Sequence, residues 1–257
     1  MNSYVFVGPT ISVAEVRAVS DATILPPVQY GDVYRLTVDR QPQVIGIIDG
    51  YFDQVLAVWH KEILWAMSQG AHVFGAASMG ALRATELAAF GMCGIGRVFA
   101  AYRDGILEDD DEVAVLHGPA ELDYRPLTEA LVNIRSTLAQ AAKQGVIDTT
   151  TCDTMTRIAK SIHYKHRSYK TLLVRAERQG ISDTERNRLN DWLPEGKIDQ
   201  KRDDALAMLI GMQTAVDRGP KRVSYYFEHT SAWEQFKTRI DHLDNRNDPE
   251  RNNSAKL

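Results

Sequence analysis

The chain has 257 residues, of which a quarter are charged, and a formal net charge of −4, which suits one large domain or two small ones. Its first 125 residues carry 8 Lys+Arg against 16 Asp+Glu, which argues against nucleic-acid binding and favours a protein partner. Two cysteines give neither a disulfide framework nor a metal-ligand spacing, and no signal peptide or long apolar run is found, so a cytoplasmic protein that does not span a membrane is expected.

The first part of the chain alternates short apolar runs with helical patterns. Each run ends at a turn that contains glycine, and the runs cover residues 4–7, 44–48 and 72–74. Helical patterns follow them at residues 13–19, at 52–67 and from Met79 onward. This alternation predicts an α/β fold with a small parallel sheet covered on both faces. The three turns place Gly8, Asp49 and Ser78 at one rim of that sheet, where open α/β sheets bind ligands.

The second part of the chain predicts helices. Residues 108–112 are five consecutive acids, which are expected to form a solvated loop, and residues 113–116 could form a further strand. Helical patterns separated by glycine or proline breaks then cover residues 126–144, 150–163, 167–179, 182–193, 198–217 and 222–241. The predicted organisation is therefore an α/β core over residues 1–125, a helical region on or beside the core over 126–242, and a disordered tail over 243–257.

Lys61 is the only lysine among the first 142 residues, and its neighbours on the predicted helix are apolar. Burial would disfavour the charged form and could lower the lysine pKa enough to give a neutral amine base. Alternatively, its stem covers apolar surface while the amine reaches water. His60 is the rival base, although a place in the core is the commoner role for a histidine in such surroundings.

Ser78 stands where an apolar run gives way to a helix. A serine at a sharp strand-to-helix turn can act as a nucleophile, with the backbone amides of Met79 and Gly80 as an oxyanion hole. The alternative is a helix N-cap, which is a favoured position for serine. The motif also departs from G-x-S-x-G, because Ala76 stands where the first glycine should be. A contact between Ser78 and Lys61 further requires residues 75–77 to be bent, since a helix and an extended strand rise at different rates.

Three other features carry weaker signals. Asp49 is either an orienting or binding carboxylate or part of an ordinary turn. Arg83 could bind a substrate carboxylate, or pair with Glu86 three residues further along the helix. Residues 160–170 are basic and are expected to form a solvated surface, with protein docking as the alternative. The two histidines of that stretch have a ligand-like spacing but lack further ligands, so no metal site is expected.

Four blocks of sequence together resemble the core of TfuA-like proteins. They lie in order within residues 3–120 and read VFVGPT (5–10), VIGIIDGYF (44–52), GAASMGALRA (75–84) and FAAYRDG (99–105). The resemblance implies a role beside YcaO enzymes, which activate peptide-backbone amides with ATP and replace oxygen by sulfur to give thioamides. It also implies hydrolysis of the C-terminal thiocarboxylate of a ThiS-like, ubiquitin-fold sulfur carrier, with release of sulfide, and support of the engagement between YcaO and its peptide.

The resemblance further implies a catalytic pair of serine and lysine. The serine falls on Ser78 through the matching motif, and the lysine is assigned to Lys61 from its isolation and position. In this hypothesis neutral Lys61 takes the Ser78 proton, the alkoxide attacks the thiocarboxylate carbon, the amides of Met79 and Gly80 hold the oxyanion, and hydrosulfide departs. Candidate substrate-binding residues are Gly8, Thr10, Asp49 and Arg83. Neither a cofactor nor a metal is expected.

Two other functions remain open from the sequence. The chain could be a non-catalytic adaptor that assembles the carrier, the peptide and YcaO, in which case Ser78 is only an N-cap. A nucleotide or phosphate site at the Gly8 turn is less well supported, because the turn matches neither G-x-x-x-x-G-K-[ST] nor G-x-G-x-x-G.

Overall fold

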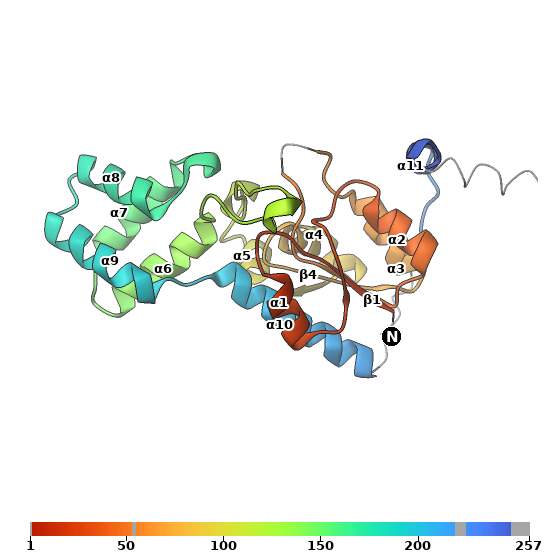
Figure 1. The fold of residues 1–257 in the computed structure, drawn as a ribbon, viewed down its shortest axis with the longest axis horizontal. Coiled ribbons are helices and arrows are strands. Elements are labelled where there is room, and N and C mark those ends of the chain that lie inside the picture. Colours follow the sequence, from red (N-terminus) through yellow and green to blue (C-terminus); the bar gives the residue numbers. More distant parts are fainter. Residues whose placement is uncertain (1, 53–54, 219–224, 248–257) are drawn as a thin grey trace, which may run out of the picture.

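The fold is taken from a computed structural model, which describes residues 2–52, 55–218 and 225–247. Within these residues a five-stranded sheet has the order β2-β1-β3-β4-β5, and every neighbouring pair is parallel (Figure 1). The α/β fold predicted from the alternation of strands and helices is therefore confirmed. The strands are β1 (Ser3–Phe6), β2 (Thr23–Leu25), β3 (Val44–Ile47), β4 (His72–Ala76) and β5 (Cys93–Ile95).

The central strands are buried on both faces. All four residues of β3 are buried, because apolar residues there face helices on either side of the sheet. Neighbouring strands are held in register, with Tyr4 opposite Ile45 and Ile45 opposite Val73. The outer strands β2 and β5 have three residues each, too short for an apolar run to stand out, and the sequence analysis missed both.

One face of the sheet is covered by helices from opposite ends of the chain. Helix α1 (Val13–Val19) begins at a capping box formed by Ser12 and Glu15. Helix α10 (Gln200–Arg218) lies on the same face, and its Met208, Leu209 and Met212 join the core formed there by strand residues such as Val5 and Phe74 (Figure 1). Part of the helical region therefore completes the α/β core.

The opposite face is covered by helices from the first part of the chain. These are α2 (Asp32–Arg40), α3 (His60–Ser68), α4 (Met79–Leu87) and α5 (Arg97–Arg103). They contribute buried apolar side chains to a common core with Phe6, Ile45, Ile47 and Val73 of the sheet. Both faces of the sheet are thus covered, as expected for a parallel sheet.

Four helices form a lobe that extends away from the sheet (Figure 1). They are α6 (Leu131–Lys143), α7 (Thr149–Lys160), α8 (Tyr169–Arg178) and α9 (Asp183–Gly196), and they share a core of their own. This set is called the lobe below. Helix α11 (Ser231–Asn247) instead packs beside α2 and α3, where Trp233 and Phe236 contact Tyr34. The predicted helical region therefore divides among three places in the fold.

Several boundaries differ from those predicted. Helix α3 begins at His60, not at residue 52, because the Glu62 carboxylate accepts the Trp59 N–H and starts the helix there. Residues 113–116 form no strand. Short 3₁₀ helices occur at η1 (Ala88–Phe90), η2 (Asp110–Glu112), η3 (Ala120–Leu122) and η4 (Tyr164–His166).

The last predicted elements were also misplaced. The helix expected over residues 222–241 begins at Ser231 and continues to Asn247. The expected disordered tail thus overlaps this helix at residues 243–247, while the rest of that prediction, residues 248–257, falls outside the described residues.

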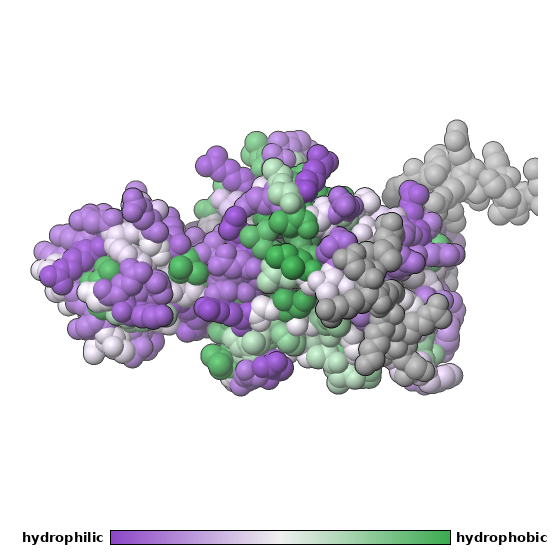
Figure 2. All heavy atoms as spheres, turned by 90° about the horizontal axis from the view of Figure 1, so that it is seen from below, coloured by the Kyte–Doolittle hydropathy of each residue, from purple (hydrophilic) through white to green (hydrophobic). Residues whose placement is uncertain are grey.

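The molecular surface differs between the core and the lobe. Figure 2 shows apolar side chains gathered in the middle of the face on which α1 and α10 lie, whereas the lobe is mostly hydrophilic. Exposed apolar residues on these two helices are Val13, Val19 and Ile210. No helix in the described ranges is both long and apolar enough to cross a membrane.

Candidate functional site

The ends of β1 and β3 form the centre of the site. The chain runs outward from β1 to β2 and then returns to β3 on the other side, so these two ends lie at the point where the strand order reverses. Asp49 follows β3 and is 1% exposed. Its carboxylate accepts the N–H of Gly8 at 2.9 Å, and it accepts both the N–H and the hydroxyl of Thr10, at 3.1 and 2.6 Å. Gly8, Thr10 and Asp49 are therefore brought together, but the Asp49 carboxylate already accepts the N–H groups of Gly8 and Thr10.

A tight turn after β4 presents Ser78. The strand is extended through Ala76, and the bend lies at Ala77, whose φ of 65° is rare for a residue other than glycine. The Ser78 N–H closes the turn by donating to the Ala76 carbonyl at 2.7 Å. Helix α4 starts at the next residue. The predicted bend thus exists, although it is confined to the last of the three residues for which it was expected.

Gly80 allows α4 to lie close to the sheet. A Cβ atom at this position would stand 1.7 Å from the Ile47 carbonyl oxygen. The close approach also lets the Gly80 N–H donate to the Ile48 carbonyl at 3.2 Å. One of the two predicted oxyanion donors is therefore already engaged, whereas the Met79 N–H has no hydrogen-bond acceptor among the described residues.

The Ser78 hydroxyl is not used as a helix cap. Ser78 occupies the N-cap position of α4 and is 2% exposed, yet its side chain makes no cap hydrogen bond. No hydrogen bond from this hydroxyl to any other described residue is found. A buried serine normally satisfies its hydroxyl locally, so the structural role that was the main alternative for Ser78 is not observed.

Lys61 lies in surroundings different from those predicted. It is in the first turn of α3, and its Nζ donates to the Thr230 hydroxyl at 2.8 Å just before α11. The same ammonium lies 5.3 Å from the centre of the Phe227 ring. No described hydrogen bond joins Lys61 to Ser78. The contacts of Lys61 therefore tie α3 to the segment that leads into α11.

The buried charged residue of this segment is Glu62. Its side chain is fully buried and accepts the N–H groups of Trp59, Gly31 and Tyr34, at 2.8, 3.1 and 3.2 Å. Burial raises the pKa of Glu62 to about 7, although these amide donors oppose the shift. Glu62 thereby joins the starts of α2 and α3.

The remaining sequence candidates have structural contacts. Arg83 donates to the Val58 carbonyl at 2.9 Å and to Glu86 at 2.7 Å, which confirms the alternative of a pair with Glu86. His60 is no core residue, because its side chain is 41% exposed and its Nε2 lies 2.7 Å from the same Glu86 carboxylate. Among the described residues, no group of three or more His, Cys, Asp or Glu could hold a metal ion.

Lys201 is a functional candidate that the sequence analysis missed. It lies in the first turn of α10 and is 3% exposed. Its Nζ donates to the Val113 carbonyl at 2.9 Å, which is its one acceptor among the described residues. Burial lowers the pKa of Lys201, while the negative charge of Asp49 opposes the shift most among its neighbours. The enclosed amine expected of Lys61 is thus found at Lys201, on the same side of the sheet as the Asp49 network.

Lys201 was hard to find from the sequence for a simple reason. Residues 201–204 read Lys-Arg-Asp-Asp at the start of a helix, which is typical of a solvated first turn. Its burial depends on α10 lying across the sheet, while Asn133 of the lobe accepts the Lys201 N–H at 3.1 Å. What sets Lys201 apart is its low solvent exposure, which is seen only in the folded structure.

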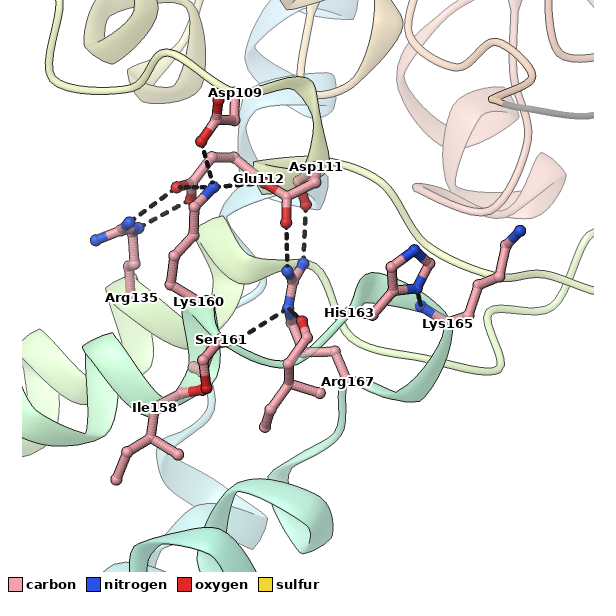
Figure 3. Close-up of polar contacts among 12 residues, drawn as sticks. Asp109, Asp111, Glu112, Arg135, Ile158, Lys160, Ser161, His163, Lys165 and Arg167 are labelled. Atoms are coloured by element: carbon pink, nitrogen blue, oxygen red, sulfur yellow. Dashed lines mark hydrogen bonds and ion pairs between the residues drawn. The ribbon is translucent and has the colours of Figure 1, made fainter. Parts of the chain in front are cut away.

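The lobe is fastened to the core by ion pairs (Figure 3). Arg167 is fully buried and donates to the Asp111 carboxylate at 2.7 Å and to the Asp111 carbonyl at 2.8 Å. Lys160 pairs with Asp109 at 2.9 Å, and Arg135 pairs with Glu112 at 2.8 Å. The acidic run predicted as a solvated loop therefore binds basic residues of the lobe.

This cluster positions one wall of a pocket. The Arg167 carbonyl accepts the Glu129 N–H at 2.9 Å, and Glu129 faces a pocket of about 390 Å³ between the lobe and the loop after β1. Thr10 and Lys201 also line that pocket, whereas Ser78 does not. Part of the basic stretch 160–170 therefore has an internal role, although Lys165 and His166 are exposed.

Comparison with known proteins bears on the region that contains Ser78. A comparison with curated proteins found no match. Residues 49–168 match the model of the family described as TfuA-like protein, a range that includes Asp49 and Ser78 but not Lys201. The match confirms the resemblance noted in the sequence: over residues 49–168 the chain is similar to the TfuA-like family.

Proposed function

We propose that this protein hydrolyses the C-terminal thiocarboxylate of a ThiS-like sulfur carrier, releases sulfide, and assists a YcaO enzyme in peptide-backbone thioamidation. Similarity to the TfuA-like family over residues 49–168 supports the pathway. The chemistry rests on Ser78 as the nucleophile. Asp49 holds the neighbouring loop in place and is not a reacting group, because its carboxylate is already bound by Gly8 and Thr10.

One observation carries the proposal: the buried Ser78 hydroxyl occupies a cap position without capping the helix. A hydroxyl at the rim of a parallel sheet, with no hydrogen-bond partner among the described residues, is free to react with a bound carbonyl. The Met79 N–H, which also lacks an acceptor among the described residues, follows it directly. Such a donor could bind the oxyanion that forms during acyl transfer.

We assign the base to Lys201 in place of Lys61. A lysine can accept a proton only when it is neutral, and burial favours the neutral form. Lys201 is enclosed and has a lowered pKa. Lys61 instead donates to Thr230 and contacts the Phe227 ring. This assignment requires Lys201 to reach Ser78 when the substrate is bound.

The reaction then follows acyl-transfer chemistry in two halves. Lys201 takes the Ser78 proton as the serine oxygen bonds to the thiocarboxylate carbon, and the Met79 N–H donates to the oxyanion. The carbon–sulfur bond breaks as Lys201 gives its proton to the sulfur, and hydrosulfide leaves with the bonding electron pair. Neutral Lys201 then takes a proton from a water that attacks the seryl ester, and it gives that proton to the Ser78 oxygen as the ester bond breaks. The products are a carrier carboxylate, hydrogen sulfide and free Ser78.

Sulfide release from a thiocarboxylated carrier tests the nucleophile. Ser78→Ala is expected to reduce the rate by at least about 10³-fold and to change the free energy of unfolding by less than about 0.5 kcal/mol, because no cap is lost. The matched control is Ser12→Ala, which removes a serine that does cap a helix. That control should cost about 1 kcal/mol of stability and leave the rate unchanged.

The outcome also separates the enzyme from an adaptor. If folded Ser78→Ala releases sulfide at the wild-type rate, the hydrolase proposal fails and the adaptor function is favoured. The YcaO part is measured separately, as thioamide formation by YcaO supplied with free sulfide. There Ser78→Ala is expected to support YcaO as well as the wild type does.

A further inference from the structure

The pocket between the lobe and the core carries charges of both signs. Its walls come from the loop after β1, from the segment before α6, and from the starts of α8 and α10. Two carboxylates, those of Glu129 and Asp199, line it together with the ammonium groups of Lys170 and Lys197 and the enclosed amine of Lys201. No ion pair joins these five residues to one another in the described structure. A small cavity with unpaired charges of both signs is suited to a polar ligand.

The two carboxylates are held in fixed positions by one amide. The Asn133 side chain is 6% exposed, and its Nδ2 donates to Glu129 Oε1 at 2.9 Å and to Asp199 Oδ1 at 3.0 Å. Asp199 Oδ1 also accepts the Arg202 N–H at the start of α10. The second oxygen of each carboxylate has no donor among the described residues. Each carboxylate therefore offers its second oxygen as an acceptor, and the contact with Asn133 fixes the orientation of that oxygen.

The ammonium groups lie among the other residues that line the pocket. Lys197 Nζ lies 4.9 Å from the centre of the Tyr169 ring, and the Lys201 amine keeps an N–H beyond the one that it donates to Val113. An apolar ligand would leave these charges desolvated and unpaired, which is costly. A ligand rich in phosphate groups would be repelled by the carboxylates of Glu129 and Asp199. A peptide main chain satisfies both sets, because its N–H donors and C=O acceptors alternate along the chain.

We infer that this pocket binds the extended C-terminal main chain of the carrier protein, with its N–H groups on Glu129 and Asp199 and its oxygens on Lys170 and Lys197. The inference rests on the proposed function and adds the binding site for the tail. Lys201 and Thr10, which line the pocket, also belong to the surroundings of Asp49. A tail bound there would approach the rim from the side of the lobe.

Steady-state sulfide release tests the inference through KM. The double variant Lys170→Ala with Lys197→Ala, and separately Asp199→Asn, are each expected to raise KM for the thiocarboxylated carrier about tenfold, a loss of about 1.4 kcal/mol of binding. The value of kcat should stay within twofold. The control is Lys143→Ala, which removes a lobe lysine that does not line this pocket and should leave KM unchanged.

A competition experiment distinguishes the tail from the body of the carrier. The carboxylate form of the intact carrier should inhibit the wild type, whereas a carrier that lacks its last four residues should not. Equal inhibition by both would assign the KM effects to the carrier surface and overturn the inference. An effect of the lysine variants without one of Asp199→Asn would also overturn it, because an anion site alone would explain that result.

Failure of the inference and failure of the proposed function look different. If the wild type releases sulfide while all pocket variants keep a normal KM, the pocket inference fails and the hydrolase proposal stands. If the wild type releases no sulfide, both fail.

Discussion

Lys61 and Lys201 differ in the contacts and the burial that the fold gives their side chains. Near Lys61 the ammonium has a hydroxyl acceptor on Thr230 and an aromatic ring on Phe227, and it connects α3 to the segment before α11. Near Lys201 the ammonium is enclosed between the sheet, the lobe and residue 113, and its acceptor is a single carbonyl. The burial around Lys201 disfavours the charged form of that lysine.

This difference shows that isolation in the sequence and isolation from water are separate properties. Lys61 is alone over 142 residues, yet the fold supplies it with partners. Lys201 has charged neighbours on both sides in the sequence, yet the fold encloses it. Next to Lys61, the fully buried ionisable residue is Glu62.

The largest effect is expected from replacing the two lysines in turn. Lys201→Met should reduce kcat for sulfide release by about 10²- to 10⁴-fold, the usual contribution of a general base. Lys61→Met should stay within about threefold of the wild type, because its contacts hold α11. Far-UV circular dichroism and urea unfolding serve to establish that both variants are folded. The reverse result, with activity lost only in Lys61→Met, would assign the base to Lys61 and not to Lys201.

A loss of stability of intermediate size is expected when Glu62, the buried carboxyl residue next to Lys61, is replaced. Glu62→Gln places an amide N–H₂ opposite backbone N–H donors, so unfolding in urea should show a loss of about 1 to 3 kcal/mol at pH 6. A loss below about 0.3 kcal/mol would mean that the three amide contacts do not stabilise the starts of α2 and α3.

The pH dependence of stability sharpens the same test. The pKa of Glu62 in the folded protein is about 7, above its ordinary value of 4.5, so the folded state binds this proton more tightly than the unfolded chain does. The resulting stability is fully present below pH 4.5 and is lost as the pH rises through 7. It should amount to roughly 3 kcal/mol between these limits. Glu62→Gln should lack this slope, and equal slopes in both proteins would contradict the assignment.

The smallest effect is expected for the contact between Lys61 and Thr230. A double-mutant cycle with Lys61→Met and Thr230→Val should give a coupling energy of about 0.5 to 1 kcal/mol in urea unfolding. Lys61→Met paired with Thr238→Val is the control, since the Thr238 hydroxyl donates within α11. Zero coupling with Thr230 would mean that Lys61 contributes nothing to the docking of α11.

Much of the fold could be predicted because its signals are local. The apolar runs at β1, β3 and β4 and the helical pattern of α1 depend on neighbours in the chain, and the sequence predicts each of them. The short edge strands and the start of α3 could not be recognised, since three-residue strands carry little pattern and Glu62 sets the helix start by contacts with Gly31 and Tyr34. The acidic run could not be placed either, because its partners lie 23 to 56 residues away.

By itself the sequence determined the resemblance to the TfuA-like family, the parallel sheet and the position of Ser78 at a strand-to-helix turn, because motifs and turns consist of consecutive residues. Only the tertiary structure decided that the Ser78 hydroxyl caps nothing, that Lys61 contacts Thr230, and that Lys201 is enclosed. Each of these depends on which distant segments exclude water from a side chain. Solvent exclusion is a property of the packed molecule, and residue order alone does not express it.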